Sequence, residues 1–159
     1  MKRIATITAC LGVLLFAVAG QALATSGAHF FSATGAINDN GSLTVSWDEA
    51  GLGQQTVNYL LTGMATAEYA CINNGTNHPK AANKESVMST VTASTSATPE
   101  NGRVKDSLTV PAPGPGMFSC PPGQTLVLAS VTYSMLMLTD LTNMVTANIG
   151  TVSRTFVKV

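Results

Sequence analysis

Alternation of apolar and polar side chains is the main pattern along this chain, and it recurs in short segments. In the segment 42–47, Leu43, Val45 and Trp47 face one way, and the hydroxyl side chains between them face the other. Because successive side chains of a strand point to opposite faces, this period of two predicts half-buried strands, and a helical period does not recur. The pattern predicts eight strands, at residues 42–47, 56–63, 66–72, 87–93, 103–110, 126–138, 144–149 and 152–159.

The predicted strand 126–138 is the longest, and one of its faces is almost wholly apolar. Its length would allow it to bend across two sheets. We expect its core-facing side chains to be Val127, Ala129, Val131, Tyr133, Met135 and Met137.

Turn-forming residues separate these segments. Asn40-Gly41 and Asn101-Gly102 suit hairpin turns that need a positive φ. The proline-rich segment 111–116 cannot donate a regular ladder of hydrogen bonds, so it predicts a surface crossover between strands. Short strands with turn signals about every ten residues favour an antiparallel two-sheet sandwich over a barrel. We therefore expect an all-β, immunoglobulin-like sandwich of about eight strands, although Trp47 precedes both later cysteines, unlike in antibody domains.

The first 24 residues have the three features of an export signal. Lys2 and Arg3 form a basic tip, the segment 11–19 is apolar, and Ala22-Leu23-Ala24 ends in the small residues that signal peptidase requires. The apolar run is about half of the roughly 20 residues that a transmembrane helix needs. We expect cleavage after Ala24, which leaves residues 25–159 as one secreted domain without a membrane span.

Charge and cysteine content narrow the partners and the compartment. The chain has eight basic and eight acidic residues, and the basic ones beyond the signal are too scattered to neutralise a run of phosphates. Nucleic acid is therefore not an expected partner. Beyond the signal only Cys71 and Cys120 remain, and outside the cytoplasm such a pair typically forms a disulfide. The alternative is two buried, unpaired thiols.

Side chains that commonly perform chemistry are sparse. The only histidines are His29, which follows closely on the cleavage site where chains tend to be loose, and His78. Asp48 and Glu49 are the only adjacent acidic pair, and in a strand they would point to opposite faces; we expect them to form a solvated corner after Trp47.

Neither a metal nor a cofactor is predicted. Two histidines without clustered cysteines match no zinc pattern. The asparagine-rich segment 73–77 could offer carbonyl groups to calcium, but such a segment is more often a series of Asx turns.

Aromatic side chains suggest where a sugar-binding patch could begin. Trp47 is assigned to the core because it shares a face with Leu43 and Val45, whereas Tyr59 and Tyr133 could keep their hydroxyl groups at an edge. The acceptor pattern for N-glycosylation occurs at Asn40 and Asn74, and it matters only in a host that glycosylates.

Two cysteine-containing segments carry a resemblance to a known group of proteins. Residues 69–85, which begin Tyr-Ala-Cys-Ile-Asn, and residues 113–130, which contain Phe-Ser-Cys-Pro-Pro-Gly-Gln, resemble small exported proteins common in actinobacteria. The ending Ser-Arg-Thr-Phe at residues 153–156 is also similar to theirs. That group has no established activity, so the resemblance implies secretion and the disulfide and provides no catalytic residues.

Two functions remain from the sequence. We favour a secreted, non-catalytic sandwich that binds an extracellular glycan or protein surface through the loops 73–83 and 111–122, which the disulfide would hold near one another. The candidate contact residues are Asn73, Asn74, Asn77, His78, Lys80 and Phe118. The alternative is a small secreted hydrolase acting on a polysaccharide or an ester, with Asp48, Glu49, Glu68 or His78 as its reactive groups.

Overall fold

The computed structural model describes residues 27–73 and 83–158. Within these ranges all regular secondary structure is β-strand. The predicted signal peptide, its cleavage site and most of the loop 73–83 lie outside the described residues. The seven strands are β1 (His29–Ile37), β2 (Leu43–Ala50), β3 (Val57–Asn73), β4 (Lys84–Ala97), β5 (Arg103–Val110), β6 (Gln124–Asp140) and β7 (Val145–Thr155).

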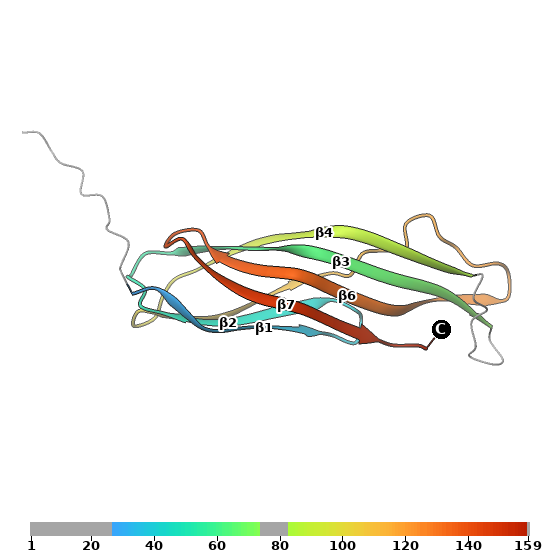
Figure 1. Cartoon of the computed structure of the whole chain (residues 1–159), viewed down its shortest axis with the longest axis horizontal. Helices are drawn as coiled ribbons and strands as arrows, with labels where there is room; N and C mark the ends of the chain where they lie inside the picture. The colour runs from blue at the N-terminus through green and yellow to red at the C-terminus, as the bar shows by residue number, and fades with distance from the viewer. Residues whose placement is uncertain (1–26, 74–82, 159) are drawn as a thin grey trace, which may run out of the picture.

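The strands form two antiparallel sheets, which confirms the predicted two-sheet sandwich (Figure 1). One sheet has the order β1-β2-β5, and the other has the order β4-β3-β6-β7. The core lies between them and is made by alternate side chains, as the period of two predicted. Leu43, Val45 and Trp47 of β2 are all buried there.

Tyr59 and Tyr133 correct one sequence-based expectation. Neither hydroxyl lies at an edge, because both side chains are completely buried in the core. The Tyr133 hydroxyl donates a hydrogen bond to the carbonyl oxygen of Gly41, at 2.9 Å. It thereby links β6 to the turn between β1 and β2.

Seven strands stand where the sequence predicted eight, and the difference has two causes. The predicted strands 56–63 and 66–72 are one continuous strand, β3, and the predicted strands 144–149 and 152–159 are joined in β7. A glycine lies within each continuous strand near the predicted break, Gly63 in β3 and Gly150 in β7. The structure also adds β1, which begins at His29, so the segment predicted to be loose is a strand paired with β2.

A bulge in β6 changes which of its side chains are buried. Met135 has a φ of 52°, and the pairing of β6 with β3 shifts register between Ser134 and Met137. One extra residue reverses the alternation, because the side-chain period of a strand is two. Leu136 and Leu138 are therefore buried, whereas Met135 and Met137 are 66% and 43% exposed, so the prediction that these two methionines face the core is wrong.

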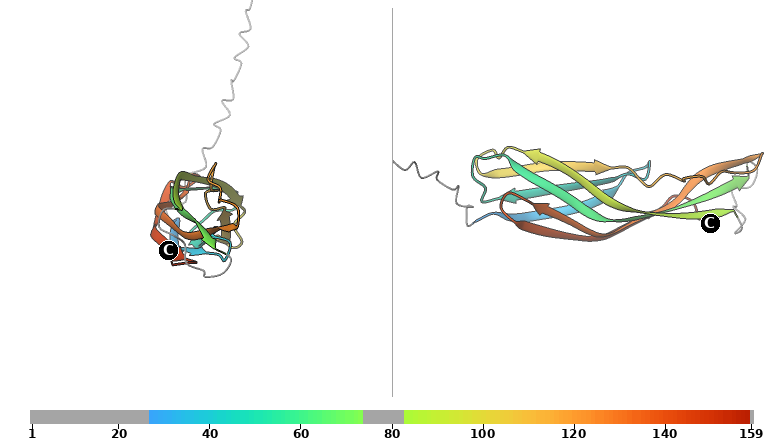
Figure 2. Two further views of the ribbon diagram at one scale, coloured as in Figure 1. Left: turned by 90° about the vertical axis from the view of Figure 1, so that its right-hand side faces the viewer. Right: turned by 90° about the horizontal axis from the view of Figure 1, so that it is seen from above.

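The two sheets differ in length, and this difference creates a projecting end. β3 and β6 each have 17 residues, whereas β2 and β5 have eight. Figure 1 and the right-hand view of Figure 2 show β3, β4 and β6 continuing beyond the three-stranded sheet. We call this projecting part, residues 69–73, 83–88 and 111–128, the disulfide end.

Candidate contact site at the disulfide end

A disulfide bond joins Cys71 of β3 to Cys120, which lies in the connection between β5 and β6. This confirms the bridge predicted from the cysteine pair. Because Cys71 is the third residue from the end of β3, the bond fixes the connection 111–123 against the projecting part of the four-stranded sheet.

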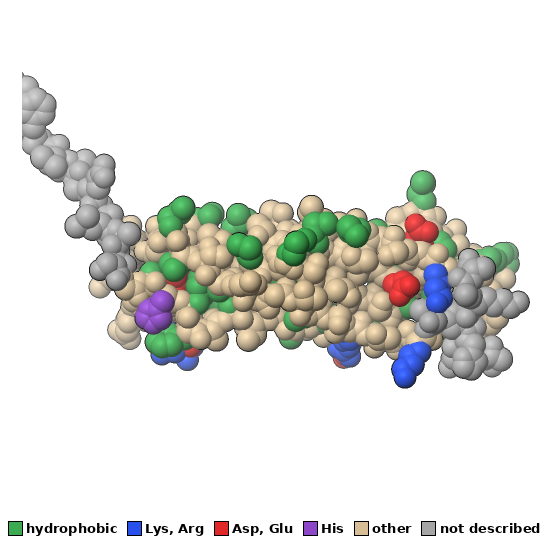
Figure 3. Space-filling model, viewed as in Figure 1, with side chains coloured by type: hydrophobic (Ala, Val, Ile, Leu, Met, Phe, Trp, Pro, Cys, Tyr) green, Lys and Arg blue, Asp and Glu red, His purple; other side chains and the backbone are tan. Residues whose placement is uncertain are grey.

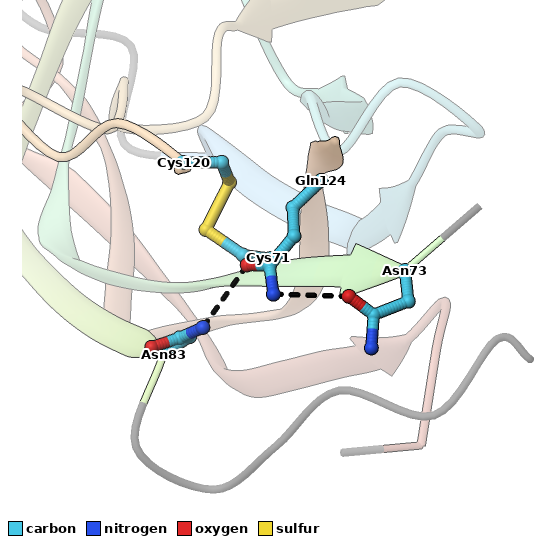
Figure 4. Close-up of a disulfide and its surroundings, with 5 residues drawn as sticks. All are labelled: Cys71, Asn73, Asn83, Cys120 and Gln124. Atoms are coloured by element: carbon cyan, nitrogen blue, oxygen red, sulfur yellow. Dashed lines mark hydrogen bonds between the residues drawn. A yellow bond between two sulfur atoms is a disulfide. The ribbon is translucent and has the colours of Figure 1, made fainter. Parts of the chain in front are cut away.

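Three amide side chains join the ends of the two predicted contact loops (Figure 4). The Gln124 amide donates a hydrogen bond to Oδ1 of Asn73 at 3.0 Å, and the Asn83 amide donates one to Oε1 of Gln124 at 3.0 Å. The backbone N–H of Cys71 also donates to the carbonyl oxygen of Asn83, at 3.0 Å. Asn73 and Asn83 flank residues 74–82, so both ends of that loop are tied to the residue that begins β6.

The connection 111–123 is held to β3 a second time near its beginning. The Tyr69 hydroxyl donates a hydrogen bond to the carbonyl oxygen of Pro113, at 2.7 Å, and burial raises the pKa of Tyr69. A tight turn follows, in which the N–H of Phe118 donates to the carbonyl oxygen of Pro115 at 3.1 Å. The connection is therefore fixed both before and after its central residues.

That turn presents an apolar tip. Phe118 is partly buried, and the neighbouring Met117 is fully exposed. No charged residue occurs between positions 111 and 123. Sequence reasoning selected Phe118 and missed Met117, although a methionine between a glycine and a phenylalanine in a proline-rich crossover has no strand to bury it.

The predicted contact residues fall into two groups. Asn73 and Phe118 lie at the disulfide end, as described above. Asn74, Asn77, His78 and Lys80 lie outside the described residues. The structure thus brings the ends of both predicted loops together and leaves the centre of the first loop undescribed.

Asp48 and Glu49 point to opposite faces of β2, as the strand pattern predicted. Asp48 lies on the outer face, where Arg103 donates two hydrogen bonds to its carboxylate at 2.6 and 2.5 Å. Lys105 lies 3.6 Å from the same carboxylate. The guanidinium group of Arg103 lowers the pKa of Asp48.

Glu49 is not part of a solvated corner, so that prediction is wrong. Its side chain is 0% exposed and continues the core-facing row that includes Trp47. Both carboxylate oxygens, the Trp47 indole nitrogen and the Tyr59 hydroxyl are buried without hydrogen-bond partners among the described residues. Burial raises the pKa of Glu49 to about 7; the Tyr59 hydroxyl opposes this rise, and the nearby Asp140 carboxylate adds to it.

Asp140 is a second buried carboxylate beside Glu49. Unlike Glu49, it is fully hydrogen-bonded: Oδ1 accepts from the N–H groups of Thr142 and Asn143, at 2.7 and 2.9 Å, and Oδ2 accepts from the Asn143 amide at 2.6 Å. These bonds shape the turn between β6 and β7. We call Trp47, Glu49, Tyr59 and Asp140 the buried polar cluster.

Glu68, another candidate for a hydrolytic site, lies apart from this cluster. Glu68 lies on β3, where it accepts a hydrogen bond from the Ser130 hydroxyl at 3.2 Å. His78 lies outside the described residues. In the ranges 27–73 and 83–158, His, Cys, Asp and Glu side chains form no group of three that could hold a metal ion. The same ranges contain no helix of the length and apolarity needed to span a membrane.

Comparison of the chain with protein-family models, with curated proteins and with solved structures finds no match.

Proposed function

We propose that this protein is a secreted, non-catalytic β-sandwich that binds an extracellular glycan or protein surface through its disulfide end. The observation that carries the proposal is the way in which Cys71–Cys120 and the Gln124 bridge tie the ends of the loops 73–83 and 111–122 together. A binding surface made of loops needs a rigid support, because ordering a loose loop costs conformational entropy on binding.

The chemistry of the tip supports an uncharged partner. Met117 and Phe118 offer apolar contact area, and prolines at 111, 113, 115, 121 and 122 limit the freedom of the backbone around them. Methionine adapts its shape to different surfaces, and aromatic rings pack on the apolar faces of sugars and side chains.

Export belongs to the same proposal. A disulfide is compatible with an extracellular location, where thiols are oxidised. We propose that residues 1–24 direct this export and that the chain is related to the small exported actinobacterial proteins that it resembles. We also propose that the sandwich is immunoglobulin-like. Its strand order agrees with that of a constant-type immunoglobulin domain except for β4, which pairs with β3 instead of joining β1, β2 and β5.

A glycan array probed with the secreted protein tests the binding role. Binding should be lost in Met117→Thr and Phe118→Ala, because each removes contact area at the tip. Met137→Thr is the matched control, since it makes the same change at an exposed methionine of β6 and should bind as the wild type does.

Two outcomes would contradict the proposal. One is binding that the tip variants leave unchanged. The other is turnover of polysaccharide or ester substrates that disappears in Glu68→Gln, which would favour the hydrolase instead.

A further inference from the structure

The two sheets have four edge strands among the described residues: β1 and β5 in one sheet, β4 and β7 in the other. An edge strand presents unpaired N–H and C=O groups that can pair with another chain. Proteins usually prevent this with charges, bulges, prolines or a covering element. The four edges of this protein differ in how far they are protected.

Three of the edges carry such protection. β5 contains Arg103, Lys105 and Asp106, and the Asp106 carboxylate accepts a hydrogen bond from the N–H of Ser107 at 2.7 Å. β1 has a register shift near Phe30, and β7 has register shifts where it pairs with β6.

β1 and β7 also cover one another across the two sheets. The guanidinium group of Arg154 in β7 donates a hydrogen bond to the carbonyl oxygen of Ile37 in β1, at 2.9 Å. A side chain at Gly35 of β1 would meet Ile149 and Val152 of β7 within 3.4 and 3.6 Å. This side of the sandwich is therefore closed.

Beyond Lys84 and Glu85 at its start, β4 has none of these protections. Its register with β3 is unbroken from Lys84 to Ala97, and residues 86–97 contain neither a charge nor a proline. Two clefts lie beside β4, towards β5 and the connection that follows β5. The one near the end of β4 is lined by Ala97 and Val104 together with charged residues of the other sheet and its preceding turn, and the one near the middle of β4 is lined by uncharged residues that include Val91 and Val110. On the face of the molecule that Figure 3 shows, the visible charged side chains lie towards the ends and the lower side.

We propose that β4 pairs antiparallel with β4 of a second copy of this chain, so that two four-stranded sheets form one continuous sheet around a twofold axis. An antiparallel pairing of a strand with itself keeps side chains of the same face opposite each other. The outward side chains of β4 are Ser86, Met88, Thr90, Thr92, Ser94 and Ser96.

The sequence of β4 is complementary to itself in such a pairing. In a pairing centred on Thr92, Thr90 lies opposite Ser94, and hydroxyl pairs of this kind stabilise neighbouring strands. No like charges meet along residues 86–97. The same register brings Lys84 of each copy to the level of Glu100 of the other, which adds attraction between opposite charges at both ends.

Sedimentation of the purified, disulfide-bonded protein over a range of concentrations tests the proposal. The wild type should sediment as a monomer and dimer in equilibrium, with the dimer increasing as concentration rises. Thr92→Lys should sediment as a monomer, because it brings two lysines together at the twofold axis. Thr92 lies on the exposed face of β4, so the melting temperature of the variant at low concentration should equal that of the wild type.

Thr146→Lys is the matched control, because it makes the same change on an exposed residue of β7, the opposite edge of the same sheet. It should retain the wild-type dimer. A wild type that stays monomeric at all concentrations would overturn the proposal. So would a dimer that survives Thr92→Lys, because it would use another surface.

Discussion

Glu49 is the residue at which sequence and structure differ most in their chemical consequences. The alternation that buries Leu43, Val45 and Trp47 continues to position 49, so the signal for its burial was present in the sequence. The expectation that Glu49 is solvated agrees with the general rule that carboxylates stay in solvent, and Glu49 is an exception to that rule. Burial penalises the charged form of Glu49, because the core does not replace the water that solvates a carboxylate, and this effect outweighs the opposing effect of the Tyr59 hydroxyl.

The raised pKa of Glu49 predicts an unusual dependence of stability on pH. The folded state keeps the Glu49 proton up to about pH 7, whereas the unfolded chain releases it near the ordinary glutamate pKa of 4.5. The folded state therefore binds more protons in this interval, and its free energy of unfolding should fall as pH rises from 4.5 to 7. In Glu49→Gln this decline should be absent, and above pH 7 the variant should be more stable than the wild type by about 2 kcal/mol.

Urea unfolding at a series of pH values measures this difference, and Asp48→Asn serves as a contrast. The pKa of Asp48 is lowered, so its stabilising effect is present above the ordinary aspartate pKa of 3.8 and disappears only as pH falls further. Asp48→Asn should therefore keep the decline between pH 4.5 and 7 that Glu49→Gln removes. Parallel curves for the wild type and Glu49→Gln would disprove a buried, protonated Glu49.

At the scale of single elements, the positions of most strands were predictable from the sequence. Which of the two alternating sets of side chains in a strand faces the core was not always predictable. In β6 both alternations are apolar near the bulge, since Met135 and Met137 occupy one and Leu136 and Leu138 occupy the other. Local pattern cannot choose between them. The choice depends on the neighbouring strand, where Gly63 of β3 lies against Leu136.

Gly63 is predicted to be necessary for the bulge. A Cβ atom at this position would lie 2.8 Å from Cδ2 of Leu136 and 3.0 Å from the carbonyl oxygen of Ser134. Gly63→Ala should therefore destabilise the fold by about 1–3 kcal/mol and lower the melting temperature by several degrees.

Gly114→Ala is the control for this substitution, because a Cβ atom there would have no neighbour within 4 Å. Calorimetry should show little change in its melting temperature. If the two variants melt at the same temperature, the close approach at Gly63 does not constrain β6.

At the scale of the whole molecule, the sandwich and its disulfide followed from the sequence, but the strand order did not. For example, β2 pairs with β5, although the two segments are far apart in the chain and neither sequence indicates its partner strand. The disulfide was predictable because Cys71 and Cys120 are the only cysteines after residue 24. The disulfide joins the ends of two loops at a projecting end of the molecule. That placement could not be predicted, because it depends on the lengths of β3 and β6, which the sequence did not reveal.

Removal of the disulfide should weaken the whole fold. The bond closes a loop with a sequence separation of 49 residues. In the chain-entropy model this is worth about 4 kcal/mol. The double variant Cys71→Ser/Cys120→Ser should therefore melt about 10 °C or more below the wild type. A melting curve equal to that of the wild type would show that the bridge has no role in stability.

The unequal sheets also determine how far apart the two ends of this molecule are. The 17 residues of β3 run from the buried polar cluster to the disulfide end, a distance of about 50 Å at the rise of a strand. β1 begins at the end of the molecule opposite the disulfide (Figure 1). The disulfide tip therefore lies about 50 Å from the end at which β1 begins, so contacts made at one end of the sandwich leave the other end free.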